Sequence, residues 1–275
     1  DAGFRYRINQ FSELELRGIL SQYRAKLEFD DGASFAYTYF NGKSINLKYE
    51  GDFRLPSIDM DINPDNGFRI VAEIGREFNS FIDSFEVDAG LIDEVFTPYN
   101  YNRFSLMGDK YWRSPLADGH AINLRLNTSF IDKNDVDDFF FLYAGGMPGM
   151  KGYSFYSLGG TRKFVSTLSY RFPLFTKINK QLFQAYIHNL YLGFFFDYGN
   201  AWVGDLDLTD FKKDVGVSLR AKLTSFYAYP TAISFEAAYG LDEFEVHEEQ
   251  FSGKYGKEWR LYLTVLFDFD LFMGI

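Results

Sequence analysis

Apolar side chains occupy every second position in several stretches of this chain, and this alternation constrains the fold more than any other feature. Near the C-terminal end, the odd positions hold Trp259, Leu261, Leu263, Val265, Phe267 and Phe269, and the even positions are mostly polar. Residues two apart lie on the same face of a β-strand, so the pattern predicts a strand with one apolar and one polar face. The same alternation recurs in residues 22–29, 122–130, 163–172, 214–224 and 233–240.

The longest of these segments span about 10–13 residues, which matches the length of a tilted strand that crosses a membrane. Strands of soluble proteins are shorter, typically about 5–6 residues. A sheet with free edges would leave backbone groups unpaired in lipid, so membrane-spanning strands must form a closed barrel. We therefore expect an all-β fold: a closed antiparallel transmembrane β-barrel of about 12–16 strands, with a loop folded into its lumen. Residues 1–275 would form this single domain. The alternative is a soluble β-sandwich, which would have shorter strands and a less aromatic apolar face.

The composition agrees with a barrel and excludes several other classes. The chain has 32 Phe and 20 Tyr, and aromatic residues make up 20% of it. Membrane barrels place aromatic residues in the lipid-facing band and in girdles at both interfaces. The formal net charge of −10 argues against nucleic acid as a partner, because phosphate contacts require basic patches. The absence of cysteine excludes disulfides, thiolate catalysis and zinc–thiolate sites.

Turn signals divide the alternating segments. Asn41-Gly42 is a strong signal for a tight hairpin between residues 35–40 and 44–50. Longer polar segments occur at Pro56–Asn66, Ile131–Asp138, Gly204–Lys212 and Leu241–Lys257. Short turns at one end and long loops at the other are typical of outer-membrane barrels. About thirteen strands can be marked, whereas single-chain bacterial barrels usually have an even number, so we expect a misassigned strand or further strands before Asp1.

The first residues contain no positively charged segment followed by an apolar one, which is the pattern of a secretory signal peptide. We expect that a signal peptide has been removed or that this chain is the C-terminal part of a longer protein.

A glycine-rich segment from Tyr143 to Tyr153 differs from the rest of the chain. Its glycines allow sharp turns and close approach to other backbone, and Lys151 lies among them. Asp197 alternates with outward-facing Phe194, Phe196 and Tyr198, so it should point into the lumen. The loop lysine and this carboxylate could pair and hold the loop inside the barrel. The alternative is that both are separately solvated.

Several motifs together resemble the outer-membrane assembly and secretion superfamily of bacterial surface antigens, which includes the Bam and Tam insertases and two-partner secretion pores. The sixth extracellular loop of that family carries a Val-Arg-Gly-Phe/Tyr tip, and Met150, Lys151, Gly152 and Tyr153 resemble it. Gly159-Gly160, the strand end Tyr170–Leu174, and Phe195-Phe-Asp-Tyr-Gly199 are similar to further motifs of the family. Pro64–Phe68, which opens a strand, is also a familiar feature of such barrels.

The resemblance implies that Lys151 faces Asp197, with Phe195 and Gly199 completing the partner motif. Two departures affect this expectation. Lysine replaces the usual arginine, so one ammonium replaces a bidentate guanidinium. The periplasmic docking modules that precede the barrel in the family are not part of this sequence. The final strand, with Trp259, Leu261, Leu263, Val265, Phe267 and Phe269, resembles the sorting signal of outer-membrane proteins. Phe269 or Phe272 would be its terminal aromatic residue, although Met-Gly-Ile follows Phe272.

No motif indicates an enzyme, a metal site or a cofactor. His120, His188 and His247 lie far apart in the sequence, beside predicted turns or loops, whereas a serine hydrolase needs a histidine beside its nucleophile. The acidic segment Asp132–Asp138 breaks the calcium-loop pattern at Val136 and lacks the turn glycine. We therefore expect no catalytic activity, no bound metal and no cofactor. The alternative is an outer-membrane phospholipase or protease barrel, because the sites of such barrels assemble only in space.

Three functions are compatible with these features. The first, which the resemblance favours, is a bacterial outer-membrane barrel that assembles, inserts or translocates polypeptides. Its partners would be lipid, lipopolysaccharide, a polypeptide substrate, and periplasmic proteins or lipoproteins. The second is a passive pore or transporter, because lumen charges set solute selectivity. The third is a membrane anchor of a larger protein. The expected lumen charges are Arg125, Arg171, Arg220, Lys222, Glu236 and Arg260.

Overall fold

The computed structural model describes residues 1–28, 34–57, 59–60, 62–88, 91–226, 229–248 and 251–267. This part of the chain is predominantly β-strand, and its helical segments are 3-10 turns at Asp138–Phe140, Phe155–Ser157 and Leu208–Asp210. Within the described residues, no helix is both long enough and apolar enough to span a membrane. The expected all-β class is confirmed.

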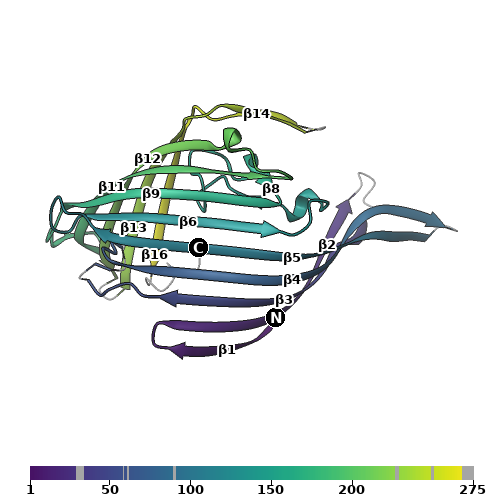
Figure 1. The fold of residues 1–275 in the computed structure, drawn as a ribbon, viewed down its shortest axis with the longest axis horizontal. Coiled ribbons are helices and arrows are strands. Elements are labelled where there is room, and N and C mark those ends of the chain that lie inside the picture. The colour runs from purple at the N-terminus through teal and green to yellow at the C-terminus, as the bar shows by residue number, and fades with distance from the viewer. Residues whose placement is uncertain are drawn as a thin grey trace. The chain divides into compact units, whose positions relative to one another are not determined.

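One large antiparallel sheet contains most of the chain (Figure 1). Its path follows the sequence through β1 (Ala2–Asn9), β2 (Ser12–Glu28), β3 (Ser34–Asp52), β4 (Gly67–Asp88), β5 (Leu91–Arg113), β6 (Ala121–Ile131), β9 (Arg162–Phe175), β11 (Ala185–Trp202), β12 (Lys212–Ser225), β13 (Tyr229–Gly240) and β16 (Trp259–Phe267). The short strand β10 (Lys180–Leu182) pairs with β11 beside this path, which makes a sheet of twelve strands in the described part of the chain. Two small hairpins lie in the connections: β7 (Leu142–Tyr143) with β8 (Gly159–Gly160), and β14 (Phe244–Glu248) with β15 (Phe251–Tyr255).

The chain divides into two compact units. The first comprises residues 1–51, 71–105 and 130–136, and aromatic stacking such as that of Tyr23 on Phe40 links its neighbouring strands. The second comprises residues 52–70, 106–129 and 137–275. The second unit contains both the glycine-rich segment and the expected lumen charges, so it holds the candidate functional residues.

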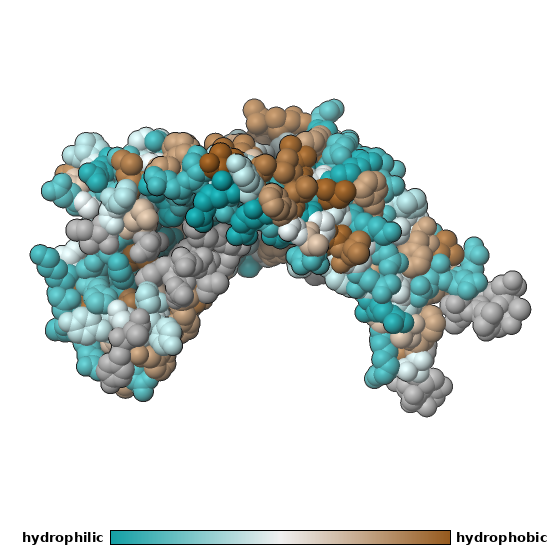
Figure 2. Space-filling model, turned by 90° about the horizontal axis from the view of Figure 1, so that it is seen from below, coloured by the Kyte–Doolittle hydropathy of each residue, from teal (hydrophilic) through white to brown (hydrophobic). Residues whose placement is uncertain are grey.

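The alternation of the sequence corresponds to two different faces of the strands in the second unit. On β11, Phe194 and Phe196 are exposed, whereas Asp197 is fully buried. On β16, Leu261 and Leu263 are 65% and 70% exposed. We call the face that carries Asp197 the inner face and the apolar face the outer face. Large apolar side chains remain exposed elsewhere too, and Figure 2 shows hydrophobic residues in brown between hydrophilic residues in teal.

The tight turn predicted at Asn41-Gly42 is wrong. β3 continues through both residues and pairs with β2 along its whole described length. The Asn41 side chain accepts a hydrogen bond of 3.0 Å from Gln22 on β2, and the missing side chain of Gly42 leaves room for the ring of Phe40. The Asn-Gly pair therefore serves packing between strands, and the β2–β3 connection at residues 29–33 lies outside the described residues.

The connections of an antiparallel path alternate between its two ends. In the second unit, those after β3, β5 and β9 share one end, and those after β6, β11 and β13 share the other. The segment Pro56–Asn66 follows β3, so it lies at the opposite end of the strands from the other long loops. The expectation that this end carries only short turns is therefore wrong. This end carries a long loop because Asp59 and Ile62 of the loop contact the inner face of the strands.

Candidate functional site

The glycine-rich segment forms a structured loop, which we call the glycine loop (residues 142–160). β7 and β8 close its base, and the Gly146 N–H donates to the carbonyl of Met150 at 3.0 Å. Gly146 has a φ of +81°, a conformation that glycine adopts without strain. A small core is buried between this loop and the ends of β9 and β11; its members are Ala144, Met150, Tyr153, Leu158, Val165 and Ala201. The loop is thus folded on itself and fixed to the sheet.

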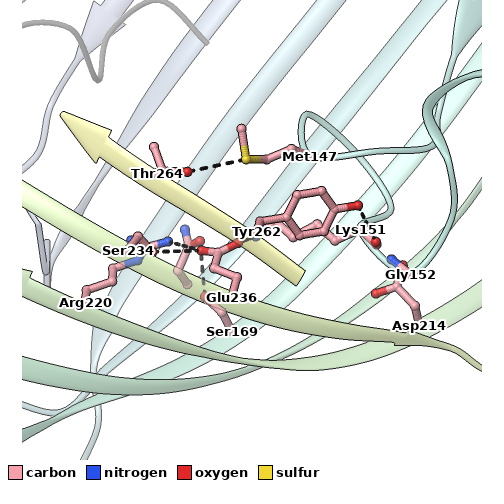
Figure 3. A network of polar contacts seen from close by, with 11 residues as sticks. Met147, Lys151, Gly152, Ser169, Asp214, Arg220, Ser234, Glu236, Tyr262 and Thr264 are labelled. Carbon is pink, nitrogen blue, oxygen red and sulfur yellow. Dashed lines mark hydrogen bonds and ion pairs between the residues drawn. The ribbon is translucent and has the colours of Figure 1, made fainter. Parts of the chain in front are cut away.

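Gly152 at the loop tip touches the inner face with its backbone. Its N–H donates to Oδ2 of Asp214 on β12 at 2.9 Å (Figure 3). A Cβ atom at this position would lie 2.5 Å from the Asp214 Cβ and 2.7 Å from the backbone nitrogen of Gly240 on β13. Contacts this short do not occur between real atoms, so only glycine fits here without displacement of one of these strands.

Lys151 is held by three strands. Its ammonium lies 2.5 Å from Oε2 of Glu236 on β13 and 4.5 Å from the centre of the Phe195 ring on β11. Its carbonyl accepts a hydrogen bond of 2.8 Å from the hydroxyl of Tyr262 on β16. Figure 3 shows Tyr262 extending toward the loop tip beside Glu236. The Lys151 ammonium is half-buried, and the carboxylate and the aromatic face beside it compensate for the partial loss of water.

The ion partner of Lys151 is therefore Glu236, and the pairing with Asp197 implied by the family resemblance is corrected. Asp197 is fully buried on the inner face and lies opposite Asp214 in the β11–β12 register. The backbone of the loop tip is bonded to Asp214, and this directs the preceding Lys151 side chain toward β13. Within the described residues, neither Asp197 carboxylate oxygen has a hydrogen bond of standard geometry, although Asp214 and the backbone N–H of Lys151 lie close to the carboxylate.

Phe195 and Gly199 of the predicted partner motif serve packing. Phe195 is buried beneath the Lys151 ammonium, and its ring fills the space left by the missing side chain of Gly216 on β12. A Cβ on Gly199 would lie 2.5 Å from the carbonyl oxygen of Phe164, so this glycine permits close contact between β11 and β9.

Tyr153 completes the attachment of the tip. Its hydroxyl donates to the carbonyl of Lys213 at 2.8 Å and accepts from the N–H of Asp242 at 3.0 Å. Burial raises the pKa of Tyr153 to about 12, so the hydroxyl remains protonated and able to donate at neutral pH. Its ring also packs against that of Phe244 of β14, with 5.6 Å between the ring centres. The tip Met150–Tyr153 is thereby attached to the last strands of the sheet by backbone, charge and ring contacts together.

A second loop, residues 53–66, reaches the inner face from the opposite end. Oδ1 of Asp59 lies 2.8 Å from the Lys222 ammonium, and Oδ2 accepts from Asn189 at 2.6 Å and from the Tyr191 hydroxyl. Burial alone would raise the pKa of Asp59, but the hydrogen bonds from Lys222 and Tyr191 lower it below its ordinary value. Ile62 of the same loop is buried with Tyr191 and Ala232. These residues were missed in the sequence, where Asp59 looks like any loop aspartate.

Each of the expected lumen charges has a contact in the structure. Arg125 pairs with Asp109 at 2.8 Å, Arg220 with Glu236 at 3.2 Å, and Lys222 with Asp59 at 2.8 Å. Arg171 donates to the Ile62 carbonyl at 2.9 Å. Arg260 pairs with Glu258, its neighbour on the same strand face. Arg125, Arg171, Arg220 and Glu236 surround one cavity, whereas Arg260 is not among its lining residues.

The predicted sorting strand and the three histidines were the remaining residues singled out in the sequence. The outward series Trp259, Leu261, Leu263, Val265 and Phe267 is exposed on β16, and Phe269 and Phe272 lie outside the described residues. His120 contacts the Tyr170 hydroxyl, and His188 contacts the Thr224 hydroxyl at 2.8 Å; the side chain of His247 lies outside the described part. No cluster of three potential metal ligands occurs among the residues that were placed.

Comparison with known protein families found no family model that matches this chain, and comparison with curated proteins found no similar sequence.

Proposed function

We propose that this chain forms a closed β-barrel in the bacterial outer membrane. The long antiparallel strands, the exposed apolar outer face and the charged inner face support this proposal. Membrane strands alternate lipid-facing apolar residues with polar residues that face the lumen. Closure satisfies the backbone groups of both edges of the sheet, which hydrocarbon cannot do.

We further propose that the barrel assembles, inserts or translocates polypeptides. The observation that carries this proposal is the attachment of Met150–Tyr153 to the inner face of β12, β13 and β16. A loop held in this way occupies the interior next to the last strands, and its release would open that space to a polypeptide. Lipid, lipopolysaccharide, the polypeptide substrate, and periplasmic or lipoprotein partners belong to the same proposal.

A passive pore is the second candidate, because one cavity on the inner face is lined by more cationic than acidic side chains. Arg125, Arg171 and Arg220 line one cavity in the second unit. Rings of charge in a lumen select solutes of opposite sign, so an open pore of this type would prefer anions.

The test begins with localisation and insertion. The full chain should fractionate with outer membranes and migrate differently on gels before and after heating, as folded barrels do. Its recovery in soluble fractions, with no lipid-associated form, would exclude the barrel.

The second stage separates the two functions. Cells that carry Gly152→Ala should lose assembled outer-membrane proteins or secreted proteins, whereas Gly108→Ala, whose Cβ would meet only the Arg69 carbonyl at 4.0 Å, should behave as wild type. In planar bilayers the wild type should show small, unsteady conductance. A large, steady, anion-selective conductance with unchanged assembly and secretion would assign the chain to the passive pores.

A further inference from the structure

A partly open cavity with an unusual charge lies on the inner face of the second unit. Its volume is about 110 Å³, room for several water molecules or one small oxyanion. Ile62 and Pro64 of the 53–66 loop line one part of it, and Lys151 of the glycine loop lines another. Arg54 of the 53–66 loop and the strands β4, β5, β6, β9, β11, β12 and β13 provide the remaining walls.

The lining is rich in positive charge. Six cationic side chains line it: Arg54, Arg69, Arg125, Lys151, Arg171 and Arg220. Asp109 and Glu236 are the carboxylates of the lining, and Asp52 pairs with Arg54 from outside it. Among the described residues of the lining, cationic side chains therefore outnumber carboxylates by six to two. Excess charge of one sign in a confined space attracts counter-ions strongly.

Arg171 is the central observation. It is only 6% exposed, and its contact in the described part of the chain is the Ile62 carbonyl at 2.9 Å, with no carboxylate within ion-pair distance. A buried guanidinium normally has a paired anion, because burial of an unpaired charge is costly. A guanidinium has five N–H donors, which exceed the single carbonyl acceptor that Arg171 has here. An anion in the cavity would supply the further acceptors.

Arg220 on β12 stands near Arg171 on β9, separated by β11. A single carboxylate, Glu236, is shared by Arg220 and Lys151, and the Arg220 Nε is buried without an acceptor among the described residues. Gly193 of β11 leaves room for the side chains of Arg171 and Ser218 on the neighbouring strands. A Cβ at this position would lie 2.7 Å from the Arg171 Cγ and 2.6 Å from the Ser218 Oγ. Ser169 and Ser218 add hydroxyl groups to the same lining.

We infer that this cavity is a binding site for a small phosphate-type oxyanion, held by the guanidinium groups of Arg171 and Arg220. Guanidinium forks match the geometry of phosphate oxygens and form charge-assisted hydrogen bonds to them. The Ser218 hydroxyl provides a further donor, and the cationic lining fits an anion that carries more than one negative charge. The site requires neither a polypeptide substrate nor an open pore.

Calorimetric titration of inorganic phosphate into the purified full chain, in chloride buffer with its detergent, tests this inference. We expect saturable binding that weakens as the salt concentration rises, since exposed and lumen charges are screened by salt. Arg171→Gln should weaken binding at least tenfold, and Arg171→Lys should weaken it less because the charge is retained. Arg113→Gln, which removes an exposed charge outside this cavity, should leave binding unchanged.

Three further outcomes decide which ligand the site binds and whether the site exists. Binding of a detergent-dispersed phospholipid headgroup, with none of inorganic phosphate, would support the phosphate chemistry and assign it to a lipid. No saturable binding of either ligand to the folded wild type would overturn the inference, and this result does not depend on whether the variants fold. Equal affinity of wild type and Arg171→Gln would also overturn it.

Discussion

The glycine loop and the 53–66 loop both attach to the inner face of the second unit, but they do so by different means. The glycine loop brings its backbone against the strands: the Gly152 N–H bonds to Asp214, and a Cβ at this position would collide with β12 and β13. The 53–66 loop reaches the sheet with a side chain, because Asp59 receives hydrogen bonds from Lys222, Asn189 and Tyr191. Backbone docking tolerates almost no change of residue, whereas side-chain docking depends on charge and therefore on pH.

Gly152→Ala should have the largest effect on this comparison. The added methyl group must displace β12 or β13, and overpacking of this kind costs about 3 kcal/mol. The measurement is the free energy of unfolding by denaturant in detergent micelles, together with protease cleavage within residues 142–160. Gly108→Ala is the matched control on β5, where a Cβ has open space. Equal stability of the two variants would show that the loop tip does not dock as described.

Asp59→Ala should have the next largest effect. The change leaves Lys222 without its carboxylate and removes hydrogen bonds from Asn189 and Tyr191, which should cost about 2 kcal/mol. Protease cleavage should rise within residues 53–66 and not within the glycine loop. Asp118→Ala, an exposed aspartate in the connection after β5, should change neither quantity. Cleavage that rises equally in both loops would mean that the two attachments are not independent.

The attachment of the 53–66 loop should also weaken in acid. The hydrogen bonds of Asp59 lower its pKa in the folded state, so its contribution is complete above the ordinary carboxyl range and is lost as the pH falls through the lowered pKa. Hydrogen exchange of the 53–66 amides, corrected for intrinsic rates, should therefore increase from about pH 6 to about pH 3. Asp59→Ala should remove this pH dependence. A pH dependence that survives in the variant would assign it to another group.

The partner of Lys151 can be identified with double-mutant cycles. Lys151→Met and Glu236→Gln should be coupled by about 1 kcal/mol, because the two groups contact each other directly. The same cycle with Asp197→Asn should give a smaller coupling energy. The opposite order would restore the pairing that the family resemblance implied.

Tyr262→Phe should have the smallest effect. It removes one hydrogen bond of 2.8 Å to the Lys151 carbonyl, which should cost about 0.5–1 kcal/mol of unfolding free energy. Cleavage of the glycine loop should rise slightly. A loss as large as that of Gly152→Ala would mean that β16 contributes more to docking than the Gly152 contact does.

The sequence by itself determined the features that depend on local chain geometry. Alternation predicts the two faces of β11 and β16, since successive side chains of a strand point to opposite sides. The dense glycines of residues 143–153 correctly marked a loop that approaches other backbone closely, because only glycine leaves that space. Asp197 was expected on the face opposite Phe194 for the same reason, and the structure buries it there.

The tertiary structure decided the contacts between residues far apart in the chain. Asn41-Gly42 predicts a turn locally, but pairing with β2 keeps the strand continuous through both residues. Lys151 could meet any inner-face carboxylate, and the backbone bond of Gly152 to Asp214 selects Glu236. Asp59 carries no local signal, because its partners lie more than a hundred residues away and become neighbours only when the sheet brings β11 and β12 beside the loop.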